Sequence, residues 1–142
     1  MKICKVVRTK NPLEKVFAYL SDFTTTTLWD PATVETLRIK GQGSVGTEYL
    51  NTSTFAGRQT QLTYIVKEFV PGQRISLRGE NKTVVAVDTI TFQPWGDGTE
   101  VTYTAEFTFK GFARLIAPFM KPAFAKLGRE AETGMRGALQ DL

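Results

Sequence analysis

The spacing of hydrophobic and polar positions changes twice along this chain. Residues 3–8 form a short apolar run typical of a strand. Asn11 and Pro12 then indicate the start of a helix, because asparagine is a favourable N-cap and proline fits the first helical position. A second short helix is expected to begin at residues 24–27 and to end before residues 29–31.

The middle of the chain consists of strand-like runs separated by turn residues. Glycine, proline, aspartate and asparagine between the runs supply the backbone angles of tight turns, so neighbouring strands are predicted to pair antiparallel. The predicted strands cover residues 34–40, 46–54, 59–70, 74–80, 83–93 and 99–109.

The last predicted strand has the clearest alternation. Threonine and glutamate occupy one face, so that face is expected to contact water. The other face is apolar and is expected to be buried; it consists of Val101, Tyr103, Ala105, Phe107 and Phe109.

Residues 111–142 have helical periodicity. Pro118 and Pro122 are poorly tolerated inside a helix, so we expect a short turn at residues 112–117 before the main helix. A narrow helix on a wide sheet leaves space that is either filled by aromatic side chains or open as a cavity. The apolar stripe of this helix is predicted to be Ile116, Met120, Phe124, Leu127, Ala131, Met135, Ala138 and Leu142.

Composition narrows the possible chemistry. The chain has 142 residues, a length that fits one domain spanning residues 1–142. It contains no histidine and one cysteine, Cys4, which excludes a Ser-His-Asp triad, a Cys-His dyad and an intramolecular disulfide. We find no carboxylate cluster suited to a metal, and we expect no metal and no cofactor. Cys4 itself is expected to be a small core residue.

The net charge of +4 is modest and not clustered as in a dedicated nucleic-acid module, so no nucleic-acid partner is expected. No apolar run is long enough for a signal peptide or a membrane span. The sequence therefore predicts a cytoplasmic protein, either a monomer or a homodimer.

Motifs along nearly the whole chain resemble one family. They are PLEKVF at residues 12–17, LSDF at 20–23, WDP at 29–31, GSVGT at 43–47, EFVPGQRI at 68–75 and GDGTEV at 96–101. Their order resembles that of the START-like (SRPBCC) superfamily, which includes the birch-pollen-allergen-like proteins, and within it the polyketide cyclase/dehydrase and lipid transport branch.

This resemblance implies an α+β, helix-grip fold. A curved seven-stranded antiparallel sheet would wrap around a long C-terminal helix, with two short helices between strands 1 and 2. It also implies a deep pocket between sheet and helix that binds lipids, sterols, polyketides or similar hydrophobic small molecules.

Asp88 is the one charged candidate for the inner face of the sheet. If the turn at residues 95–98 pairs Phe92 with Val101, Asp88 faces inward among apolar neighbours, where a carboxylate needs a partner or a raised pKa. A bulge that turns Asp88 outward, with Val85 and Val87 facing in, remains the alternative.

The other candidates have both a binding and a structural interpretation. Tyr64 and Tyr103 either hold a ligand carbonyl or hydroxyl, or bond to the backbone or solvent. Arg58, Arg74 and Arg78 are more simply explained as solvated charges on the outer face. The predicted ligand-binding residues are Trp29, Tyr64, Asp88, Tyr103, Phe107, Phe109, Met120, Phe124 and Leu127, although the apolar ones are equally suited to core packing.

Three functions follow from these features. The first is a binding or carrier protein for a hydrophobic small molecule. The second is a polyketide cyclase or dehydratase in which Asp88 and Tyr103 transfer protons. The third is a ligand-free regulatory or interaction module. Residues 110–129 are basic and apolar without an acidic residue, which indicates either transient membrane contact or a lid over the pocket.

Overall fold

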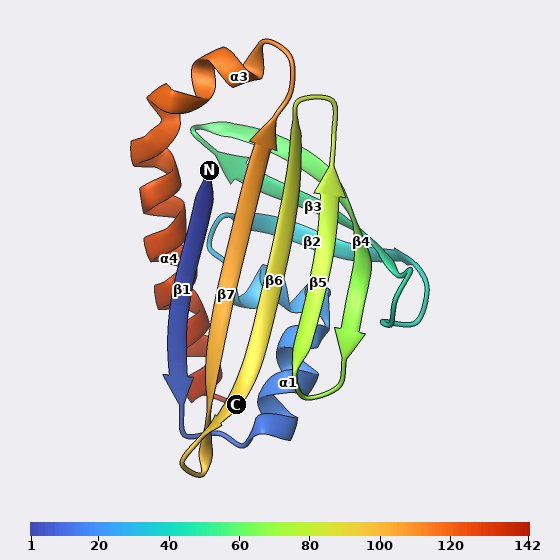
Figure 1. Ribbon diagram of the computed structural model, residues 1–142, viewed down its shortest axis with the longest axis vertical. Coiled ribbons are helices and arrows are strands. Elements are labelled where there is room, and N and C mark those ends of the chain that lie inside the picture. Colours follow the sequence, from blue (N-terminus) through green and yellow to red (C-terminus); the bar gives the residue numbers. More distant parts are fainter.

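One curved antiparallel sheet dominates the computed structural model, which describes residues 1–142 (Figure 1). Its strand order is β1-β7-β6-β5-β4-β3-β2, so every neighbouring pair except β1 and β7 is consecutive in the chain. The strands are β1 (Lys2–Thr9), β2 (Thr33–Lys40), β3 (Glu48–Phe55), β4 (Arg58–Val70), β5 (Arg74–Glu80), β6 (Val84–Trp95) and β7 (Gly98–Phe109).

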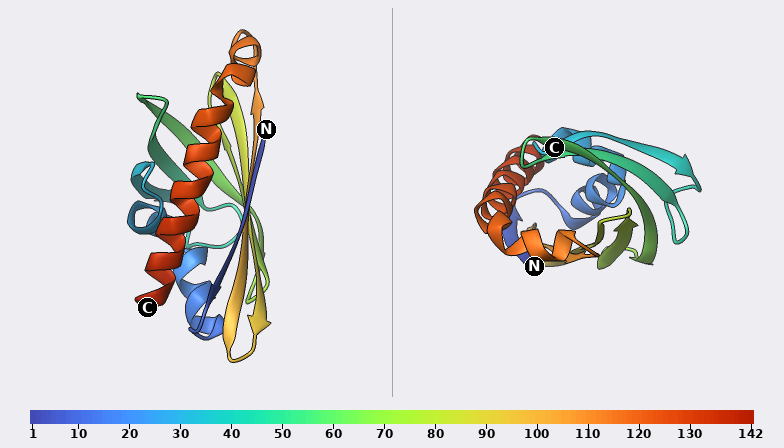
Figure 2. Two further views of the ribbon diagram at one scale, coloured as in Figure 1. Left: turned by 90° about the vertical axis from the view of Figure 1, so that its left-hand side faces the viewer. Right: turned by 90° about the horizontal axis from the view of Figure 1, so that it is seen from above.

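The helices lie on the concave side of this sheet. Figure 1 shows α1 at one end of the sheet and α3 at the other, and Figure 2 shows α4 running between these ends. This is the predicted helix-grip architecture. The helices are α1 (Leu13–Ser21), η1 (Phe23–Thr25), α2 (Thr26–Trp29), α3 (Ala113–Ile116), η2 (Ala117–Met120) and α4 (Lys121–Gln140).

The β6–β7 register decides which way Asp88 points. Phe92 pairs with Val101, and four positions further along each strand Asp88 pairs with Ala105. Asp88 is only 5% exposed and faces the interior. The inward orientation is confirmed and the bulge is wrong, because the pairing continues without a shift from Val84 to Trp95.

Three local predictions at the N-terminus are wrong. Asn11 does not cap α1, because its Nδ2 donates to the Leu139 carbonyl at 2.6 Å; Pro12 takes the N-cap position instead. The second short helix includes Trp29 rather than ending before it. Cys4 is exposed, because the pairing of β1 with β7 places Ile3 inward and Cys4 outward beside Thr104.

The buried stripe of α4 differs from the predicted one. Ile116 is exposed, because the chain bends through α3 and η2 before α4 starts, whereas Ala138 and Leu142 are only partly buried. Two positions that are absent from the predicted stripe, Gly128 and Leu139, are buried. The stripe is Phe124, Gly128, Ala131, Met135 and Leu139.

Glycine sets how closely α4 approaches its neighbours. A Cβ on Gly134 would lie 1.9 Å from the Trp29 carbonyl oxygen, so α4 and α2 are in backbone contact there. A Cβ on Gly128 would meet the Ile3 side chain of β1 at 3.1 Å. These glycines weaken the helix by themselves but permit the contacts that stabilise it.

None of the helices combines the length and the apolar character that a membrane-crossing helix requires.

We predict that Gly134→Ala destabilises the fold by about 1–3 kcal/mol, because the new methyl group must push α4 away from Trp29. The matched control is Gly137→Ala in the same helix, where nothing lies within 4 Å of the new Cβ. That change should stabilise the protein by up to about 1 kcal/mol through helix propensity. Urea unfolding measures both, and equal effects of the two changes would contradict the proposed contact.

Candidate ligand-binding site

Partly buried side chains lie at both ends of the concave face. At the α1 end, the Phe17 ring packs edge-on against Phe69 and Phe92, with ring centroids 5.5 and 5.0 Å away. At the α3 end, Val84 and Phe109 are only partly buried. Phe17 and Phe69 are also only partly buried, so the two ends do not differ in this respect.

Phe124 lies at the start of α4 and packs among aromatic side chains toward the α3 end. Its ring lies 5.0 Å from that of Phe107 and 5.7 Å from that of Phe109. The nearest ring, at 4.6 Å, is that of Phe55. The strand pattern placed Phe55 in the turn between two predicted strands, so the sequence analysis did not select it as a site residue. The hairpin of β3 and β4 curves toward α4, and no local sequence pattern indicates this curvature. At this level the space is occupied by aromatic side chains.

Asp88 and Tyr103 form a polar pair deeper in the interior. The Tyr103 hydroxyl donates to Asp88 Oδ2 at 2.9 Å, and Asp88 Oδ1 is buried with no hydrogen-bond partner in the protein. Burial raises the pKa of Asp88 to about 7, while the hydrogen bond from Tyr103 opposes the rise and the charge of Asp30 adds to it. The pKa of the Asp88 carboxyl group therefore lies close to neutral pH.

Trp29 adds a second unpaired polar atom beside this pair. Its indole is 2% exposed and packs edge-on against the Tyr103 ring, with centroids 5.5 Å apart. The indole nitrogen Nε1 is buried and donates to no protein atom. Since buried polar groups are rarely left unpaired, this N–H donor and this carboxyl oxygen beside Tyr103 need a partner that the protein does not supply, such as an ordered water or a polar ligand group.

Tyr64 is buried and Asp30 is partly buried, and both interact electrostatically with the Asp88–Tyr103 pair. Burial raises the pKa of Tyr64 well above its ordinary value, and the charges of Asp88 and Asp30 add to the effect. Tyr64 is accommodated because Gly79 lies opposite it in β5, where a Cβ would lie 2.7 Å from the ring. Sequence analysis did not select Asp30, whose Oδ1 and Oδ2 accept hydrogen bonds from the residue 32 amide and the Thr33 hydroxyl.

Two grooves flank α4 on its outer sides. One, of about 590 Å³, lies between α4 and β1 and includes Phe124 in its wall. The other, of about 410 Å³, lies between α4 and the β3–β4 turn and includes Leu127. Asp88 and Tyr103 line neither groove, so the predicted candidates divide between the interior and the two sides of the helix.

The remaining candidates have simpler roles. Met120 is partly buried against the core. Arg74 pairs with Glu68 at 3.2 Å and Arg78 with Glu80 at 2.9 Å, both exposed, while Arg58 is exposed. These arginines are therefore surface charges, which confirms their interpretation as solvated side chains.

Comparisons with known proteins agree with this architecture. A family model described as "Polyketide cyclase / dehydrase and lipid transport" matches residues 3–142. No curated protein sequence is significantly similar to the chain.

Solved structures share the fold at low sequence identity. The Zhui aromatase/cyclase from Streptomyces sp. R1128 superposes with a TM-score of 0.82 at 12% identity, over 98% of this chain and 93% of that chain. The protein TTHA0849 from Thermus thermophilus gives 0.81 at 14% identity, over 98% and 97%. A START superfamily protein from Mycobacterium smegmatis gives 0.80 at 13% identity, over 97% and 96%.

We predict that Asp88→Asn stabilises the fold in a pH-dependent manner. In the unfolded chain Asp88 ionises near its ordinary pKa of 3.8, but in the folded protein only near 7, so rising pH between these values favours unfolding. The substitution should therefore change little at about pH 4 and should gain up to about 4 kcal/mol above pH 7.

Urea unfolding across this pH range measures the effect. In Tyr103→Phe the hydrogen bond that lowers the pKa of Asp88 is lost, so the pH-dependent loss of stability should extend to higher pH. This account would be contradicted if the free energies of unfolding of Asp88→Asn and the wild type differed by the same amount at pH 4 and above pH 7.

Proposed function

Because the chain belongs to the polyketide cyclase/dehydrase and lipid transport family, we propose that it binds a hydrophobic small molecule between the sheet and α4. The proposed ligand is a lipid-, sterol- or polyketide-like molecule with a hydroxyl or carbonyl group. The observation that carries the proposal is the pair of unsatisfied buried atoms, Asp88 Oδ1 and Trp29 Nε1, beside Tyr103.

The chemistry of these atoms supports a ligand with one polar end. The Trp29 N–H is a donor only, whereas Asp88 accepts when ionised and donates when protonated. A ligand hydroxyl has the donor and acceptor character to pair with either residue, and a ligand carbonyl is an acceptor for Trp29 or for the protonated form of Asp88. The surrounding apolar residues suit the rest of the ligand, because burial of apolar surface drives its binding.

The proposed route of ligand entry is the α3 end of the concave face. Phe107 and Phe109 lie between that end and Tyr103 on the same face of β7. A ligand that reaches Asp88 from there must displace the Phe124 ring, so binding requires α4 or its aromatic contacts to move.

A proton-transfer enzyme is the second candidate, and the raised pKa of Asp88 favours it. A carboxyl group with a pKa of about 7 is both an effective acid and an effective base at neutral pH. Tyr103, bonded to Asp88, positions that carboxyl group and supplies a second hydroxyl. Together they suit abstraction of a proton from an enolisable polyketide and its return to oxygen during dehydration.

The carrier proposal predicts that the protein retains one apolar molecule when it is purified from its own host. Native mass spectrometry should show a single mass addition, which solvent extraction then identifies. Ala105→Leu narrows the interior beside Asp88 and should reduce the occupied fraction at least about tenfold, since overpacking of a filled site costs about 1–3 kcal/mol.

The matched control is Ala125→Phe, which narrows the groove between α4 and β1 instead. It should leave occupancy unchanged. If only Ala125→Phe loses the ligand, the binding site is the groove between α4 and β1. If the folded wild type retains no molecule, the carrier proposal is contradicted.

For the enzyme candidate, Asp88→Asn should abolish conversion of an enolisable poly-β-ketone substrate, measured by product chromatography. Because the same substitution is expected to stabilise the fold at neutral pH, lost turnover is not explained by unfolding. Unchanged turnover would remove Asp88 from any catalytic role.

A further inference from the structure

The segment between β7 and α4 exposes apolar side chains where a surface segment usually presents polar ones. Phe112 is 75% exposed, Leu115 67%, Ile116 44% and Phe119 84%. Their spacing places them on the outer side of α3 and η2, while Ala117 is buried against the protein. These four exposed residues are called the apolar tip below.

The apolar tip lies at the end of the concave face opposite α1. Figures 1 and 2 show α3 as the outermost element at the end of the molecule opposite α1. The segment is fixed at its start, because the Lys110 amide donates to the Thr83 carbonyl at 2.8 Å in the turn between β5 and β6. At its other end it continues directly into α4.

Cations without partners surround the apolar tip. Arg114 and Lys121 lie within or next to it, are exposed and form no ion pair. Lys82, which is also exposed and unpaired, precedes Thr83 in the turn that contacts Lys110. No acidic residue occurs between residues 110 and 129.

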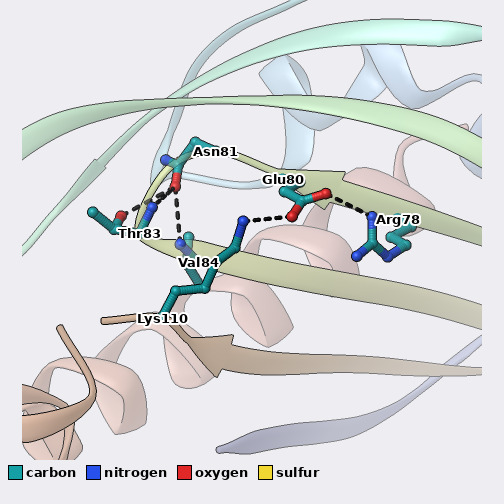
Figure 3. A network of polar contacts seen from close by, with 6 residues as sticks. All are labelled: Arg78, Glu80, Asn81, Thr83, Val84 and Lys110. Carbon is teal, nitrogen blue, oxygen red and sulfur yellow. Dashed lines mark hydrogen bonds and ion pairs between the residues drawn. The ribbon is translucent and has the colours of Figure 1, made fainter. Parts of the chain in front are cut away.

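The acidic residue at the base of the segment is already neutralised. Glu80 accepts hydrogen bonds from Lys110 and, at 2.9 Å, from Arg78 (Figure 3). In the adjacent turn, Asn81 Oδ1 accepts from the amides of Thr83 and Val84 and holds the turn in place. The free charge at this end is therefore positive.

We propose that the apolar tip docks on the surface of a membrane that contains anionic phospholipids. Phe112, Leu115 and Phe119 enter the headgroup region, and Arg114, Lys121 and Lys82 contact the phosphates. Exposed apolar residues beside cations bind such surfaces through apolar burial and electrostatic attraction together. A second copy of the chain is a poorer partner, because it would bring the same cations together.

This proposal goes beyond the proposed function, since the apolar tip lies outside the interior and its docking needs no bound ligand. Docking in this orientation brings the α3 end of the concave face against the lipid.

Co-sedimentation with large vesicles tests the proposal. The wild type should bind vesicles of equal parts phosphatidylcholine and phosphatidylglycerol and should not bind phosphatidylcholine alone. The Phe112→Ser, Phe119→Ser double variant should bind at least about tenfold more weakly. The Arg114→Glu, Lys121→Glu double variant should also lose at least about tenfold, because each basic residue contributes about fivefold near an anionic surface.

Matched controls change similar residues elsewhere. Leu28→Ser removes a 72% exposed leucine from α2, and Lys15→Glu reverses an exposed charge on α1 at the opposite end. Both should bind like the wild type. Failure of the wild type to bind anionic vesicles, equal binding to neutral ones, or wild-type binding by the double variants would overturn the proposal. A further outcome would also overturn it: the wild type sediments as a dimer, and the phenylalanine double variant sediments as a monomer but binds vesicles as strongly as the wild type.

Discussion

The close packing of α4 across the concave face of the sheet is the contact on which the other features depend. It requires small residues where the helix backbone approaches Ile3 of β1 and the Trp29 carbonyl of α2, and Gly128 and Gly134 supply them. The same packing buries Phe124 among three phenylalanine rings and encloses Asp88 and Tyr103. Trp29, whose carbonyl lies against Gly134 of α4, packs on Tyr103 beside Asp88, and burial there raises the pKa of the Asp88 carboxyl group.

Enclosure gives the site its chemical character. Asp88 is destabilising to the fold above its folded-state pKa, so its presence in an otherwise apolar interior favours a functional role over a structural one. Its hydrogen bond to Tyr103 offsets only part of that penalty, because Oδ1 remains unpaired. The family suits either a bound hydrophobic ligand or cyclase-type chemistry, and both proposals place the ligand beside this carboxyl group.

Much of the fold was predictable because its signals are local. Alternation in residues 99–109 identified the inner face of β7. The turn at residues 95–98 left two orientations of Asp88 open, and the continuous β6–β7 pairing decided for the inward one. Predictions failed where a distant contact decided the outcome. Asn11 bonds to Leu139 rather than capping α1, and Cys4 faces outward because β1 pairs with β7, about 100 residues away in the chain.

By itself the sequence determined the elements, their order, the absence of histidine chemistry and the set of residues suited to an apolar interior. Periodicity, turn residues and composition act over a few positions and are therefore visible in one chain. Only the tertiary structure decided that Phe55 joins the Phe124 cluster, that the Trp29 and Asp88 polar atoms are left unpaired around Tyr103, and that Phe112 and Phe119 point to solvent. Those outcomes depend on the curvature of the sheet and the position of α4, which arise from packing between segments far apart in the chain.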